Sequence, residues 1–109
     1  MKDFGTTKEY DVKIKSFMGE VKAYVHMETI NETSFRGHVK LMGISSEFSE
    51  GISDGNNHKF IINLPLPFGK TTISIDADVD ENGIVTGVAV MSKRKPMELT
   101  GVQVARADS

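Results

Sequence analysis

The sequence predicts an all-β fold: an eight-stranded antiparallel up-and-down barrel built from two duplicated four-stranded halves. A two-sheet β-sandwich is the alternative. Three observations lead to this prediction. Apolar and polar residues alternate with a period of two, glycine-containing turns separate the alternating stretches, and glycines recur fifty residues apart. The barrel is favoured because eight strands can close a sheet, and closure removes exposed edge strands.

The internal repeat relates residues 5–53 to residues 55–103 within a single domain spanning residues 1–109. Four glycine pairs share the offset: Gly5/Gly55, Gly19/Gly69, Gly37/Gly87 and Gly51/Gly101. With ten glycines in 109 positions, chance would produce roughly half a pair at one offset. The two halves are therefore expected to have similar structures.

The first half contains expected strands at residues 9–17, 20–30, 34–42 and near 45–53, and the second half repeats this order, with its fourth strand near 97–105. The predicted inward face of the first half is Tyr10, Val12, Ile14, Val21, Ala23, Val25, Met27, Phe35, Gly37, Val39 and Leu41. That of the second half is Phe60, Ile62, Leu64, Ile73, Ile75, Ala77, Val79, Val85, Gly87, Ala89 and Met91.

One turn predicts the strand register. Asp80-Glu81-Asn82-Gly83 is typical of a three-residue hairpin loop with glycine in a left-handed conformation, which places Ala77 opposite Gly87. Fifty residues earlier, the same register pairs Met27 with Gly37, Glu28 with Arg36 and His26 with His38. In this register apolar residues face apolar residues and Glu28 faces an opposite charge.

Composition limits the classes of function. Charged residues are 26% and apolar residues 39% of the chain, which is typical of a globular protein. The net charge of -2 predicts no nucleic-acid partner, and no apolar run is long enough to span a membrane. The chain has no cysteine, and neither a cofactor nor a metal site is predicted. Its amino terminus lacks the apolar stretch of a secretory signal, so we expect a cytoplasmic protein.

The predicted architecture resembles the calycin-type barrels, the broad group of lipocalins and fatty-acid-binding proteins. The stretch Gly-x-Val-x-Leu-Met-Gly at residues 37–43, followed by Phe48 and Gly51, is similar to short uncharacterised bacterial barrel proteins. The chain has no tryptophan and so lacks the Gly-x-Trp signature of lipocalins. The resemblance implies a barrel whose lumen can hold an apolar small molecule, and it implies no particular activity.

Small residues on the predicted inward face raise the question of a hollow lumen. Native interiors are densely packed, so several glycines and alanines in one wall favour a cavity unless bulky neighbours fill the space. The candidate lumen residues are Tyr10, Ala23, Met27, Gly37, Glu47, Ser49, Ala77, Gly87, Ala89 and Met91.

The fourth strand of each half breaks the pattern. In the first half Ser46 and Phe48 share one face while Glu47 and Ser49 share the other, so a parity shift is expected, at a position the sequence does not define. Either choice of inward face places a polar group inside the barrel.

Three classes of function stay open. The first is a binding module for an apolar small molecule in the lumen. The second is a barrel-type cyclase or isomerase using Glu47, Ser49 or Tyr10. The third is a ligand-free accessory or interaction domain. Ile84, Val88 and Val90 are apolar at outward positions, which predicts a homodimer interface.

Overall fold

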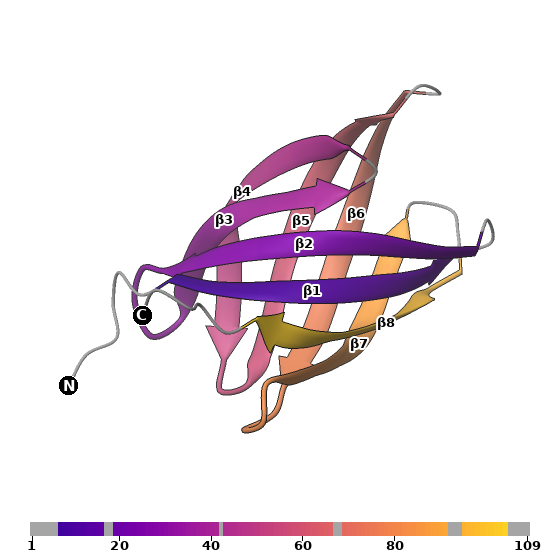
Figure 1. Cartoon of the computed structure of the whole chain (residues 1–109). Helices are drawn as coiled ribbons and strands as arrows, with labels where there is room; N and C mark the ends of the chain where they lie inside the picture. Colours follow the sequence, from indigo (N-terminus) through magenta and orange to yellow (C-terminus); the bar gives the residue numbers. More distant parts are fainter. Residues whose placement is uncertain (1–6, 17–18, 42, 67–68, 92–94, 105–109) are drawn as a thin grey trace.

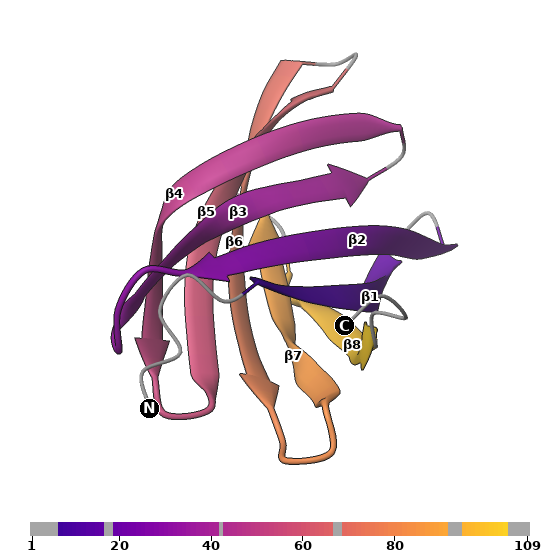
Figure 2. The same ribbon diagram turned by 60° about the vertical axis from the view of Figure 1, so that its left-hand side comes forward.

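The computed structural model describes residues 7–16, 19–41, 43–66, 69–91 and 95–104. It contains eight strands: β1 (Thr7–Ser16), β2 (Gly19–Thr29), β3 (Ser34–Leu41), β4 (Ile44–Asp54), β5 (Asn57–Leu66), β6 (Gly69–Val79), β7 (Ile84–Met91) and β8 (Met97–Val104). Each strand pairs antiparallel with its neighbours in the chain, and β8 returns to pair with β1 (Figures 1 and 2). The predicted eight-stranded up-and-down barrel is therefore confirmed over the sandwich.

The predicted hairpin register is also confirmed. Ala77 lies opposite Gly87, and Met27 lies opposite Gly37. In the turn between β6 and β7, Gly83 has a φ of 79° and its amide donates to the Asp80 carbonyl over 3.0 Å. The Asp80 carboxylate accepts from the amides of Asn82 and Ile84 at 2.8 and 2.9 Å, which stabilises the turn.

The core lies inside the barrel, on the face predicted from the alternation. Its buried apolar side chains are Tyr10, Val12, Ile14, Ala23, Val25, Met27, Phe35, Val39, Leu41, Phe48, Phe60, Ile62, Leu64, Ile73, Ile75, Ala77, Val85, Ala89 and Leu99. Val21, Val79 and Met91 are partly buried and pack against this group. Burial of these side chains supplies the main driving force for closing the sheet.

The fourth strands differ because β4 contains an extra residue. Phe35 lies opposite Gly51, but two residues further along β3 Gly37 lies opposite Phe48, so three residues of β4 face two of β3. In a regular strand buried and exposed residues alternate, but Ser49 and Glu50 are both exposed. The β-bulge therefore lies between Phe48 and Gly51. The expected parity shift is thus located in the first half.

The second half has no such bulge. Val85 lies opposite Gly101 and Gly87 lies opposite Leu99, an unbroken register. The first three strands of each half therefore share one register at an offset of fifty, whereas the fourth strands do not. The duplication itself stays a prediction.

The bulge also affects how β4 meets β5. The hydrogen-bonded ladder between them joins Ile52–Asp54 to Asn57–Lys59. Farther along, side chains connect the strands: the Ser46 hydroxyl donates to the Asn63 carbonyl over 2.8 Å, and the rings of Phe48 and Phe60 stack with centroids 4.3 Å apart. Because a bulge disrupts the ladder locally, backbone pairing joins β4 to β5 on one side of it and side-chain contacts join them on the other.

Candidate functional site

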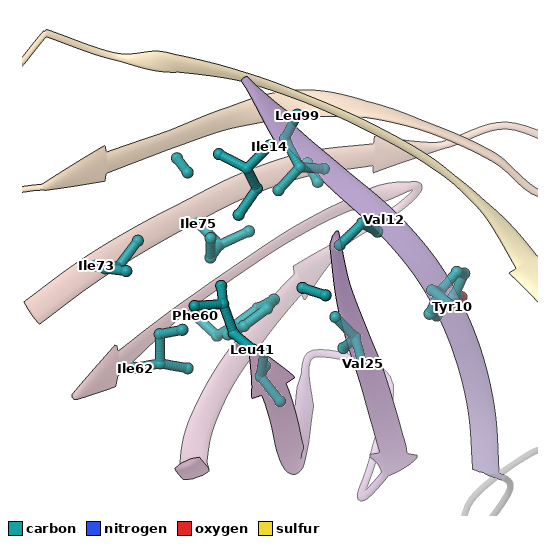
Figure 3. Close-up of a cluster of buried hydrophobic side chains, with 14 of the residues drawn as sticks. Tyr10, Val12, Ile14, Val25, Leu41, Phe60, Ile62, Ile73, Ile75 and Leu99 are labelled. Carbon is teal, nitrogen blue, oxygen red and sulfur yellow. The ribbon is translucent and has the colours of Figure 1, made fainter. Parts of the chain in front are cut away.

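The lumen is almost filled. Apolar side chains from opposite walls converge inside the barrel (Figure 3). They leave a cavity of about 40 Å³, whose lining includes four of the predicted lumen residues, Tyr10, Ala23, Met27 and Ala77. Sites for drug-sized ligands usually measure about 300–1,000 Å³, so this cavity is too small for a lipid.

Three phenylalanines account for much of the filling. Phe35 meets Phe48 and Phe60 edge to face, with ring centroids 5.6 and 5.8 Å away, and Phe48 stacks on Phe60. Such pairs stabilise a core beyond the area they bury. This aromatic cluster, Phe35, Phe48 and Phe60, occupies volume that a hollow barrel would leave to a ligand.

The inward glycines serve a different purpose from lining a cavity. A Cβ atom added to Gly37 would lie 1.8 Å from the backbone oxygen of His26, and one added to Gly87 would lie 2.2 Å from that of Asp76. Glycine is needed at both positions because the neighbouring strand approaches so closely. Ala89 is fully buried and Met91 is partly buried, but neither borders the cavity.

Two titratable side chains border the cavity, Tyr10 and His58. Burial raises the pKa of Tyr10. The pKa of His58 is lowered, first by burial and then by the positive charge of Lys8, while Asp78 opposes the shift. Nδ1 of His58 lies 2.9 Å from the Ser53 hydroxyl. His58 is not among the lumen residues predicted from the sequence, although its spacing of two residues from Phe60 signals the same inward parity.

Glu47 and Ser49 do not face the lumen. Both are exposed on the outer wall, because the bulge follows Phe48 and Ser46 takes the inward position. Ser46 satisfies its buried hydroxyl by donating to the Asn63 carbonyl. Of the three groups considered for catalysis, Tyr10 is the one that borders the cavity.

The outer wall carries a row of four titratable residues. Glu9 of β1 lies opposite His26 of β2, His26 lies opposite His38 of β3, and His38 lies opposite Glu47 of β4. The imidazole rings of His26 and His38 stack with centroids 5.0 Å apart and planes 14° from parallel. We call Glu9, His26, His38 and Glu47 the outer row.

Neighbouring groups hold the outer row in place. The Tyr24 hydroxyl donates to Oε1 of Glu9 over 2.5 Å, and Glu9 is only 7% exposed despite its outward parity. The Tyr24 ring also lies beside His38, with centroids 6.3 Å apart. At the far side Arg36 and Glu28 form an ion pair of 2.8 Å, as their predicted pairing requires. A surface hollow follows this wall, lined in part by His26, Arg36, His38 and Glu47.

Metal binding is not indicated by this arrangement. Within the described ranges, no group of three or more histidine, aspartate or glutamate side chains has a geometry that could hold a metal ion. The outer row presents hydrogen-bonding and charged groups. The sequence predicted the His26–His38 pairing, but it gave no indication that Glu9 and Glu47 would extend it, because their strands had no predicted register.

The predicted interface residues lie on the outer wall of β7. Ile84 and Val88 are exposed, and Val90 is partly buried. Ile84 lies directly opposite the exposed Val102 of β8, which makes a small apolar patch near the β6–β7 turn.

The chain matches no protein-family model, and no curated protein or solved structure is significantly similar to it. The likeness to calycins therefore rests on the closed eight-stranded architecture alone. The described part of the chain contains no helix with the length and hydrophobicity of a membrane span.

Proposed function

We propose that this barrel is a binding module that presents a polar site on the outer wall of β1–β4, with a lumen that mainly serves packing. The observation that carries the proposal is the outer row, four titratable side chains aligned across four strands beside a surface hollow. Binding sites bring several polar and charged side chains together, and here four separate strands each contribute one.

The supporting contacts favour a site that is ordered before its ligand arrives. A carboxylate as buried as that of Glu9 is unfavourable without partners, and Tyr24 supplies a short hydrogen bond to it. Stacking limits the rotation of His26 and His38. Side chains ordered in advance lose less entropy on binding, which raises affinity.

A second candidate is a lumen site for a small apolar molecule. The lining of the lumen cavity favours this candidate. The surface around its volume of about 40 Å³ is apolar, and an apolar cavity excludes water and accepts apolar ligands. A ligand the size of a xenon atom would fit without rearrangement. A larger one would require movement of the aromatic cluster.

Native mass spectrometry of protein purified from its own cells distinguishes the two candidates. The outer-wall proposal predicts a retained adduct on wild type and on Val25→Ile, which reduces the cavity, but not on His26→Ala/His38→Ala. An adduct lost on Val25→Ile and kept on the double histidine variant would overturn the outer-wall proposal. It would support the lumen instead.

A further inference from the structure

A second hollow on the outer wall is lined by lysines. It lies over β8, β1, β2 and β3, has a volume of about 750 Å³, and is lined in part by Lys13, Lys22, Lys40, Tyr24, Thr100 and Asp11. We call it the lysine groove. Its volume falls within the usual range for small-molecule sites. Asp11 is the one acidic side chain among the described residues that line it.

The lysines come together through the strand register. Lys13 of β1 lies directly opposite Lys22 of β2, and Lys40 of β3 lies opposite Tyr24, two residues further along β2. Like charges directly opposite each other destabilise a sheet. The arrangement is therefore an energetic cost unless an anion offsets it.

No close ion pair in the described ranges offsets it. None of Lys13, Lys22 and Lys40 forms an ion pair there, in contrast to Lys15, which lies 3.2 Å from a carboxylate oxygen of Glu98. The whole chain has a net charge of -2, so the groove is a local positive region on an acidic protein.

The other half of the barrel shows that the fold does not need these charges. At the positions fifty residues later stand Asn63, Thr72 and Val90, with Asn63 opposite Thr72 as Lys13 is opposite Lys22. Thr72 donates a hydrogen bond of 2.7 Å to the Asn63 side chain, so an uncharged pair satisfies the same register.

We propose that the lysine groove binds a small molecule carrying two or more phosphate groups. Lysine ammonium groups are compact cations that bind phosphate oxygens, and three of them match a ligand with several negative charges. The hydroxyl of Thr100, at the groove wall, adds an uncharged hydrogen-bond donor. This site goes beyond the proposed function: it adjoins the outer row through Tyr24, which lines the groove and donates to Glu9, and it shares no residue with that row.

The test is a calorimetric titration of the purified full chain with inorganic pyrophosphate at low ionic strength. Lys13→Asn/Lys22→Thr introduces the residues of the other half at both positions, and it should weaken pyrophosphate binding at least about tenfold. Lys59→Asn/Lys70→Thr removes the same net charge outside the groove and should change affinity by no more than about twofold.

Thermal melting curves show whether the two double variants are folded. Because Lys13→Asn/Lys22→Thr removes an opposed like-charge pair, its Tm without ligand should equal or exceed that of wild type. Pyrophosphate should raise the Tm of wild type and of Lys59→Asn/Lys70→Thr, but not that of the groove variant.

Three results would overturn the proposal: no pyrophosphate binding by wild type, equal losses in the two double variants, or citrate binding as tight as pyrophosphate. Equal losses would mean that net charge alone is sensed, and tight citrate binding would mean that phosphate is not recognised. If pyrophosphate fails to bind while His26→Ala/His38→Ala still loses a retained adduct, the proposed outer-wall site stands and only the lysine groove is rejected as a phosphate site.

Discussion

Replacing Gly87 by alanine should destabilise the barrel strongly. The new Cβ would lie 2.2 Å from the Asp76 carbonyl oxygen and 2.6 Å from the Cα of Ala77, closer than the 3.0 Å at which real Cβ atoms stop. Strands β6 and β7 must then separate by about 1 Å at this point, straining the backbone ladder. Overpacking of this kind costs about 1–3 kcal/mol, and each weakened ladder bond adds about 1 kcal/mol.

These two terms together cost about 2–4 kcal/mol. The loss of unfolded-state entropy on changing glycine to alanine gives back about 0.4–1 kcal/mol, which leaves a net loss of about 1–3.6 kcal/mol. For a domain of this size each kcal/mol corresponds to about 4–8 °C, so the Tm should fall by at least about 4 °C. Thermal and urea unfolding followed by circular dichroism measure both quantities.

Gly55→Ala is the matched control. Gly55 has a φ of 61° in the β4–β5 turn, and its added Cβ would meet nothing within 4 Å, so only left-handed strain of about 1–2 kcal/mol applies. A Gly87→Ala protein that melts within about 2 °C of wild type would refute the close-approach argument. It would restore the view that Gly87 faces free space, under which even Gly87→Leu should be tolerated.

Phe48→Ala should lower the free energy of unfolding by about 3–5 kcal/mol and increase uptake of an environment-sensitive apolar dye, because the substitution removes a buried ring from the lumen. Unchanged dye fluorescence would mean that the barrel collapses around the vacated volume. The pKa of His58 in the folded protein lies below its ordinary 6.5, so on acidification the unfolded chain binds this proton first. The contribution of neutral His58 to the free energy of unfolding is therefore fully present above about pH 6.5 and is lost as the pH falls toward the lowered pKa. His58→Gln should flatten that part of the Tm-against-pH curve, and a variant with the wild-type slope would contradict the assignment. Val88→Lys should weaken self-association if the β7 wall forms a homodimer, and sedimentation showing a monomer for both proteins would dispose of that interface.

The sequence predicted the strands and their inward faces because both follow from local patterns. Alternation with a period of two marks which side of a strand is buried, whatever the sheet pairs with. The turn at Asp80–Gly83 then relates β6 to β7, since a hairpin loop of defined length permits one register. That is why the sequence alone predicts His26 opposite His38.

The β4 strand shows where local pattern stops being sufficient. Its parity changes at the bulge by Ser49 and Glu50, and no turn signal marks that position. Ser46 rather than Glu47 faces inward because of contacts with residues distant in the chain. The Ser46 hydroxyl donates to the Asn63 carbonyl, and the neighbouring Phe48 stacks on Phe60. Burial of Glu47 would have cost a desolvated carboxylate, which the closed barrel avoids.

By itself, the sequence determined an antiparallel barrel with an apolar interior and a polar wall, since face and hairpin register are local properties. Only the tertiary structure decided how much of the interior is empty, because cavity volume depends on which side chains meet across the barrel, as Phe35 meets Phe48 and Phe60. It also decided which polar groups gather outside. Glu9 and Glu47 join the two histidines through the pairings of β1 with β2 and of β3 with β4, whose registers were not predicted from the sequence.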